Sequence, residues 1–149
     1  KMEDRHVIER QLAGDPNVHL IGVFDGHRGM EAADYCAAAL TQHLAASWQG
    51  QATLEGALAA SFVSADADFC AKEEQERERA ASLGLKAEAR RAGCTAIAAM
   101  LYGTTLVLAN AGDCRAVMSS KGRVTQLTRD HSADDEEERA RIVLAGGLA

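Results

Sequence analysis

The chain has 149 residues, which is the size of one domain or of part of a larger one. Thirty of them are alanine, so the larger apolar side chains suffice for one modest core. The net charge of −6 and the aromatic content of 4% argue against a surface for nucleic acid or anionic lipid. No apolar run approaches the ~20 residues that span a membrane.

The first part of the chain is predicted to form a β-hairpin. Residues 3–10 are predicted as one strand, and the apolar run over 18–25 predicts a second, buried strand. Residues 11–17 between them contain Gly, Asp, Pro and Asn, which are typical of a turn. We therefore expect the two strands to pair as antiparallel neighbours.

Two helices are predicted to follow the hairpin. Apolar residues recur at helical spacing over 30–48, and a second helix is expected to begin near Thr53, a common N-cap residue. Residues 72–91 contain six basic and five acidic residues. Such mixed charge is typical of a solvated helix extension or an insertion, and not of a binding patch.

Short strands are predicted in the second half of the chain, after Gly93. The expected strands cover 94–102, 105–111, 114–119 and 124–127. An acidic-to-basic segment over 134–145 predicts a last helix. Because strands and helices are segregated along the chain, the sequence predicts an α+β fold with mainly antiparallel sheet.

The cysteines do not form a recognisable motif. Their spacings are wide and contain no C-x-x-C pair, so neither a zinc site nor a disulfide framework is predicted. We expect four reduced thiols in an intracellular protein. The residues are Cys36, Cys70, Cys94 and Cys114.

Two acidic residues of the predicted hairpin are the first candidates for a functional site. If Arg10 pairs with Val18, Glu3 lies directly opposite Asp25 on the same face. Like charges in that position destabilise a sheet, and a divalent cation such as Mg²⁺ or Mn²⁺ would compensate them. The alternative is an ordinary acidic strand end followed by an Asp-Gly turn.

Three further groups of residues have both a functional and a structural interpretation. His27 could act as a general acid beside a metal, or could be an exposed loop histidine. The segment 110–113 contains Asp113 and fits a tight turn between strands. The acidic cluster 134–138 is typical of a helix N-terminus, and less typical of a metal site.

Five motifs in order along the chain resemble those of a known family. They are Lys1-Met2-Glu3-Asp4, Val23 to Gly29, Gly93-Cys94-Thr95-Ala96, Asn110 to Arg115, and Thr128 to His131. Together they resemble the metal-dependent type 2C serine/threonine protein phosphatases (PPM family). The resemblance spans nearly the whole chain and is nearest to plant and green-algal members.

The resemblance implies a four-layer α-β-β-α sandwich with two Mn²⁺ or Mg²⁺ ions at one end and a further, weaker metal site. Asp25 would bridge the two ions. Glu3 and the backbone carbonyl of Gly26 would hold one of them, and Asp113 would help to hold the weaker metal.

The resemblance also implies roles for residues that do not bind metal. Asp4 would accept a hydrogen bond from a metal-bound water. His27 would protonate the leaving serine or threonine oxygen. Thr95 would be structural.

The chain departs from the family pattern at both ends. The family's phosphate-binding arginine precedes the Met-Glu-Asp motif, and its later metal-binding aspartates have no counterpart here. We therefore expect residues 1–149 to be the N-terminal portion of a catalytic domain, taken from a longer chain, with an insertion or extended charged helix at about 72–91.

The expected function is that of a metal-dependent protein serine/threonine phosphatase. A metal-activated water would hydrolyse phosphoserine or phosphothreonine, and this fragment alone would be inactive. The alternative is a truncated or non-catalytic pseudophosphatase, acting as a regulatory binding module. The expected partners are phosphorylated protein substrates, without nucleic acid or membrane insertion. We expect a monomer in the cytoplasm or nucleus.

Overall fold

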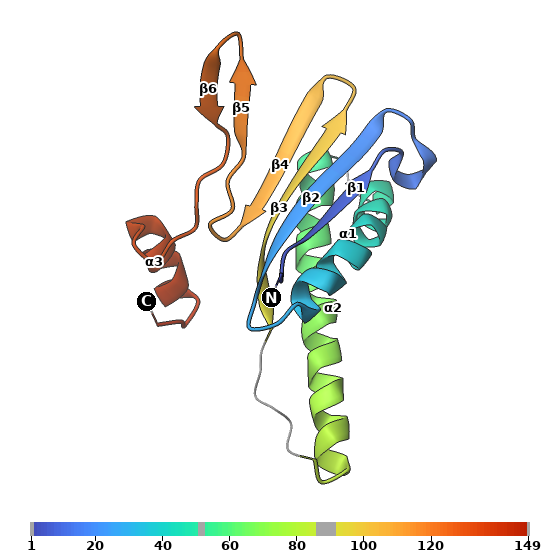
Figure 1. Ribbon diagram of the computed structural model, residues 1–149, viewed down its shortest axis with the longest axis vertical. Coiled ribbons are helices and arrows are strands. Elements are labelled where there is room, and N and C mark those ends of the chain that lie inside the picture. Colours follow the sequence, from blue (N-terminus) through green and yellow to red (C-terminus); the bar gives the residue numbers. More distant parts are fainter. Residues whose placement is uncertain (1, 51–52, 86–91, 149) are drawn as a thin grey trace.

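The computed structural model describes residues 2–50, 53–85 and 92–148. A four-stranded sheet has α1 and α2 along one face, while the hairpin β5–β6 and helix α3 lie to one side (Figure 1). The elements are, in chain order, β1 (Arg5–Glu9), η1 (Leu12–Gly14), β2 (Val18–His27), α1 (Glu31–Gly50), α2 (Leu54–Ser82), β3 (Gly93–Tyr102), β4 (Thr105–Ala111), β5 (Val117–Ser120), β6 (Arg123–Gln126) and α3 (Glu136–Leu144).

The main sheet is antiparallel throughout, with the strand order β1-β2-β3-β4. Each strand pairs with its neighbour in the chain, and β5 pairs only with β6 in a separate two-stranded sheet. The α+β prediction with mainly antiparallel sheet is therefore confirmed. The predicted strand over 114–119 begins later, at Val117, because the chain first leaves the main sheet through a bend at Gly112.

The predicted register of the first hairpin is wrong by one residue. The structure pairs Glu9 with Leu20 and Val7 with Gly22, and Val18 donates its N–H to the carbonyl of Asp15 instead of pairing with Arg10. The predicted register would have moved the half-buried Val7 to the opposite face of the sheet. A shift of one residue reverses every side chain of a strand, so burial of one face fixes the register.

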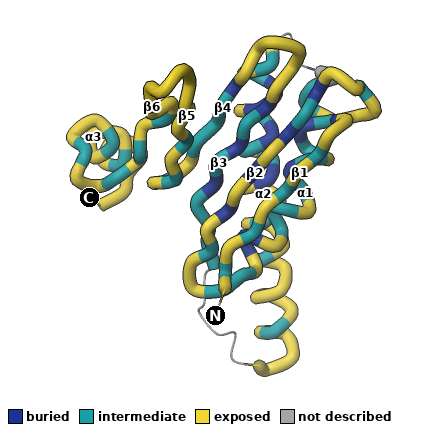
Figure 2. The backbone as a smooth tube through the Cα atoms, turned by 45° about the horizontal axis from the view of Figure 1, so that its top comes forward, coloured by how far each residue is buried: buried dark blue, intermediate teal, exposed yellow. Residues whose placement is uncertain are grey.

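The core lies between the sheet and the two helices. Along β2, alternate residues point toward the helices and are fully buried, and Figure 2 shows this alternation along the strand. The second helix contributes Leu58 and Ala65 to this core. Thr53 caps α2 as predicted, because its Oγ1 accepts the N–H of Gly56 at 3.0 Å. The largest fully buried side chains are Phe24, Leu12, Leu20, Leu40, Leu44, Leu58, Met100 and Val18.

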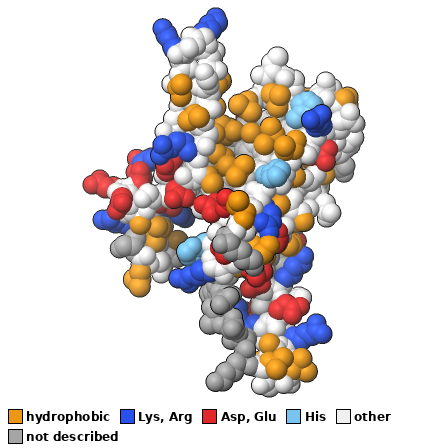
Figure 3. Space-filling view, in the orientation of Figure 1, with side chains coloured by type: hydrophobic (Ala, Val, Ile, Leu, Met, Phe, Trp, Pro, Cys, Tyr) orange, Lys and Arg blue, Asp and Glu red, His pale blue; other side chains and the backbone are white. Residues whose placement is uncertain are grey.

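The other face of the sheet is also apolar, but it is exposed. Ile8 is 60% exposed, Ile21 is 52% exposed and Val23 is 44% exposed, and all three point away from the helices. Hydrophobic side chains gather over this face in Figure 3. Leu101 and Leu106, paired on β3 and β4, extend the same surface. We call this surface the open face of the sheet.

The charged part of α2 extends beyond the sheet (Figure 1). The helix ends at Ser82, residues 83–85 follow it outside the helix, and positions 86–91 of the predicted segment lie outside the described residues. Arg77 and Glu74 form an ion pair of 2.5 Å on this extension. Among the helices of the described ranges, none combines the length and apolar character that a membrane span requires.

Candidate functional site

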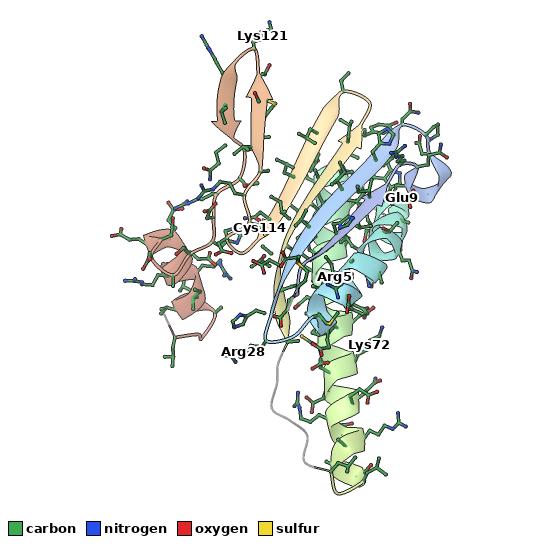
Figure 4. All side chains as sticks on the ribbon, viewed as in Figure 1. Arg5, Glu9, Arg28, Lys72, Cys114 and Lys121 are labelled. Carbon is green, nitrogen blue, oxygen red and sulfur yellow. The ribbon has the colours of Figure 1, made fainter. Side chains whose placement is uncertain are left out.

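The candidate residues gather at the end of the sheet where β2 and β4 end and β3 begins. Asp25 pairs with Thr95 on β3, and Ala111, the last residue of β4, pairs with Ala96. Asp113 follows β4 by two residues and is exposed, so it lies at the same end of the sheet as Asp25. Figure 4 labels Arg28 in the loop after β2 and Cys114 in the segment after β4.

Gly26 lies directly against Glu3. A Cβ atom at Gly26 would be 2.6 Å from the backbone carbonyl oxygen of Glu3 and 3.1 Å from its Cβ. The carboxylate of Glu3 accepts the N–H of Gly29 at 3.4 Å. Glu3 is therefore held between the end of β2 and the loop that leads to α1, and only glycine fits at position 26.

The hypothesis that Glu3 lies directly opposite Asp25 is wrong. Since Arg5 pairs with Phe24, continuing this register sets Asp4 opposite Asp25 and Glu3 opposite Gly26. Both Asp4 and Asp25 are exposed, whereas Glu3 is half-buried. The two carboxylates that face each other in the register are therefore those of Asp4 and Asp25, and the carboxylate of Glu3 is a third one at the same end of the hairpin.

His27 shares the open face with Asp25. It is the last residue of β2, pairs with Gly93 and is exposed. Alternate residues of a strand point to the same side, so residues 25 and 27 are on one face. Arg28 and Gly29 then adopt positive φ values of 63° and 143°, and this turn reverses the chain into α1.

Sequence reasoning missed Arg5 as a positioning residue. Its guanidinium forms an ion pair with Asp34 in the first turn of α1 and donates to the carbonyl of Asp4 at 2.8 Å. These contacts tie the start of β1 to α1, beside Glu3 and Asp4. The partners are 29 residues apart, so no local pattern could have indicated the pair.

The loop after β4 is held by Thr95. A Cβ atom at Gly112, where φ is 103°, would be 2.7 Å from Cγ2 of Thr95. Thr95 Oγ1 also lies 2.9 Å from the sulfur of Cys114. Asn110 donates to the carbonyls of Gly112 and Arg129 at 3.0 and 3.1 Å. This segment is therefore a fixed bend, and Asp113 projects from it.

The acidic cluster 134–138 is a helix N-terminus, as the structural interpretation held. Asp135 is the N-cap of α3, and its Oδ1 accepts the N–H groups of Glu137 and Glu138 at 3.0 and 3.1 Å. The hydrogen bond from Arg129 is the largest of the causes that lower the pKa of Asp135. The carboxylate of Asp135 therefore caps the helix, and the cluster has a structural role.

The candidate residues do not by themselves complete a metal site. Within the part of the chain that the structure describes, no three His, Cys, Asp or Glu side chains are grouped so that they could hold a metal ion. Glu3, Asp4, Asp25 and the carbonyl of Gly26 lie at one end of the sheet. Asp113 lies across β3 from them.

Comparisons with known proteins identify the family of the chain. The family model "Protein phosphatase 2C" matches residues 1–149. The chain belongs to the protein phosphatase 2C family. The resemblance predicted from the five motifs is therefore confirmed, and proteins of this family in general depend on Mn²⁺ or Mg²⁺.

The relatives come from both plants and ciliates. The chain is 36% identical to "Probable protein phosphatase 2C 32" of Oryza sativa subsp. japonica, covering 99% of this chain and 35% of the relative. It is 38% identical to "Probable protein phosphatase 2C 6" of Paramecium tetraurelia, covering 99% of this chain and 49% of the relative. The chain therefore spans between a third and a half of these relatives.

A solved structure shows the same fold. The crystal structure of serine-threonine phosphatase 2C from Toxoplasma gondii aligns with a TM-score of 0.80 at 22% identity, covering 99% of this chain and 51% of that one. The predicted fold class is thus confirmed for a partial domain, which contains the four-stranded sheet with its two helices and the two-stranded sheet β5–β6.

Replacing Gly26 with Ala should destabilise the chain by about 1–3 kcal/mol, because the new methyl group overlaps the backbone of Glu3. Urea unfolding of the two proteins measures this difference. Gly93→Ala is the matched control, since a Cβ atom at Gly93 meets nothing within 4 Å. Its effect should stay within about 0.5 kcal/mol. Equal effects at both positions would show that the contact between Gly26 and Glu3 is not tight.

Proposed function

We propose that residues 1–149 are the N-terminal part of the catalytic domain of a metal-dependent protein serine/threonine phosphatase. The observation that supports this most directly is the contact of Glu3 with Gly26 at the end of the sheet where Asp25 is exposed. It brings the Met-Glu-Asp and Asp-Gly-His motifs of the family together, although they are some twenty residues apart in the sequence.

The donors at this end of the sheet fit Mg²⁺ or Mn²⁺. Carboxylate and carbonyl oxygens are the hard ligands that these ions prefer. In the proposal Asp25, Glu3 and the carbonyl of Gly26 would hold two such ions, and Asp113 would help to hold a further one. When bound, such ions lower the pKa of a coordinated water and neutralise the phosphoryl oxygens.

The remaining roles belong to Asp4 and His27. Asp4 is exposed and opposite Asp25 in the register, so its carboxylate can accept a hydrogen bond from the attacking water. His27 is exposed on the face of Asp25 and donates a proton to the serine or threonine oxygen as it leaves. The substrates would be phosphorylated proteins, and no covalent enzyme intermediate is needed.

A second candidate is a non-catalytic regulatory module. The observation that favours it is that the described residues group no three potential metal-ligating side chains. In that case the carboxylates at the end of the sheet would contribute to folding or recognition. The protein would neither bind a metal ion through them nor hydrolyse a phosphopeptide.

Activity of the complete protein that contains residues 1–149 separates the two candidates. We expect it to hydrolyse a phosphothreonine peptide in the presence of Mn²⁺, to lose that activity with a chelator and to regain it when excess Mn²⁺ is returned. Calorimetry of Mn²⁺ binding is the independent readout. A folded protein without turnover and without Mn²⁺ binding would support the regulatory module.

A further inference from the structure

Two cysteines from distant parts of the chain face each other. Cys36 lies on α1 and Cys94 near the start of β3, 58 residues further along the chain. Their sulfur atoms are 3.7 Å apart, and the thiol of Cys94 donates a hydrogen bond to the sulfur of Cys36. Both residues are half-buried and both are free thiols. Their spacing in the sequence gave no indication of this contact.

The pair is accessible to a small molecule. Cys36 and Cys94 line a cavity of about 830 Å³ between α1, α2 and β3. Its walls are largely apolar, with Phe24 and Phe62 among them. Cys70, which also lines it, is exposed, so the cavity reaches the surface. A small uncharged reagent can enter such a space more readily than a large or charged one.

The two thiols are not equivalent. The hydrogen bond from Cys94 lowers the pKa of the Cys36 thiol, and it outweighs burial and the Asp66 carboxylate, which both raise that pKa. The thiolate is the reactive form of cysteine, so the contact favours Cys36 as the attacking sulfur. Cys94 is then placed to react with whatever Cys36 becomes.

We propose that Cys36 and Cys94 form a peroxide-reactive dithiol site, which hydrogen peroxide or a small organic hydroperoxide converts to an intramolecular disulfide. The site would covalently link α1 to β3. It does not depend on the proposed phosphatase function, and neither cysteine has a role in the proposed metal site, although Cys94 pairs with Gly26 in the sheet.

The reaction balances with the hydroperoxide as the only oxidant. The Cys36 thiolate attacks one peroxide oxygen, the O–O bond breaks, and the other oxygen leaves as hydroxide, giving a sulfenic acid. The sulfur of Cys94 then attacks the sulfenic sulfur, the S–O bond breaks and the S–S bond forms. The departing oxygen takes up the Cys94 proton and leaves as water. The oxygen that left first takes up the proton that the Cys36 thiol had lost. Two thiols are therefore oxidised, and hydrogen peroxide is reduced to two waters, or an organic hydroperoxide to an alcohol and one water.

The other two cysteines are less suited to the same reaction. The sulfur of Cys114 is hydrogen-bonded to Thr95 Oγ1 at 2.9 Å. Cys70 is exposed on α2 and would be expected to form disulfides between molecules. These two residues therefore provide matched controls within the same chain.

The test is peptide mapping of the reduced 149-residue chain after treatment with hydrogen peroxide, with remaining thiols alkylated in denaturant. Free thiols should fall from four to two, with the Cys36 and Cys94 peptides joined. Cys70→Ser should keep this crosslink, and Cys36→Ser should abolish it. A main product that involves Cys70 or Cys114, or retention of all four thiols at peroxide levels that oxidise free cysteine, would overturn the proposal.

Two further arms keep the test decisive if a variant folds poorly. In the wild-type chain unfolded by urea, the preference for the Cys36–Cys94 product should disappear, because the native contact is lost. An unchanged preference would contradict a role for the fold. In Cys94→Ser, dimedone should label Cys36 as its sulfenic acid several-fold faster than Cys70. Faster labelling of Cys70 would contradict the assigned reactivity.

Discussion

Replacing Asp25 with Asn in the complete protein should lower kcat/KM toward a phosphothreonine peptide by about 100-fold or more. In the proposed site Asp25 would be a metal ligand, so the substitution would remove a negative charge that helps to hold the ions. Metal ions contribute several kcal/mol to the stabilisation of a phosphoryl transition state, and each 1.36 kcal/mol corresponds to about a factor of ten. Mn²⁺ affinity, measured by calorimetry, should fall together with the activity.

His27→Gln is the matched comparison, because it alters the same exposed end of β2 without removing a metal ligand. A general acid typically contributes about 100- to 10,000-fold, and most when the leaving group is a poor one. We therefore expect a large loss on the phosphothreonine peptide, a small loss on an aryl phosphate with a good leaving group, and unchanged Mn²⁺ affinity. Asp25→Asn should reduce both activities alike. Equal loss of metal by both variants would contradict their separate roles.

The sequence predicted those parts of the fold that depend on local patterns. The apolar run over 18–25 correctly indicated β2, and Thr53 correctly indicated the start of α2. Both follow from residues within a few positions of each other. The end of that strand was not predicted correctly, because β2 continues through Gly26, which lies against the backbone of Glu3, to His27.

Features that depend on distant contacts were not accessible. The register of the first hairpin depends on the bond from Val18 to Asp15 and on which side of β1 becomes buried. The ion pair of Arg5 with Asp34 and the contact of Cys36 with Cys94 join different elements of the fold. No periodicity along the chain records such contacts, and only the folded arrangement brings the partners together.

The apolar residues on both faces of β2 have a common physical meaning. A strand that is apolar on one face only can leave the other face in water, whereas a strand that is apolar on both is normally covered on both. Here Ile21 and Val23 are exposed on the open face, while Leu20 and Phe24 are buried under the helices. The same open face carries Asp25 at its end. We therefore expect that whatever covers the open face in the complete protein also completes the proposed site.

The isolated 149-residue chain should accordingly be a poor phosphatase. With only the carboxylates of this end of the sheet, it should bind Mg²⁺ weakly, because Mg²⁺ gives up its water reluctantly and demands near-ideal octahedral geometry. Its turnover of a phosphopeptide with Mn²⁺ should be about 100-fold or more below that of the complete protein. Parallel assays of the two proteins at equal concentration provide the measurement.

The open face supplies the control for this last comparison. Exposed apolar surface promotes association, so the isolated chain should self-associate in sedimentation experiments. Ile21→Glu, at a position 52% exposed, should reduce that association without loss of stability in the isolated chain. In the complete protein the same substitution should be destabilising, because a charge would then be buried.

If the dispersed Ile21→Glu chain still lacks turnover, aggregation is not the cause of its inactivity. Comparable turnover by the isolated chain and the complete protein would show that residues 1–149 already form the whole site.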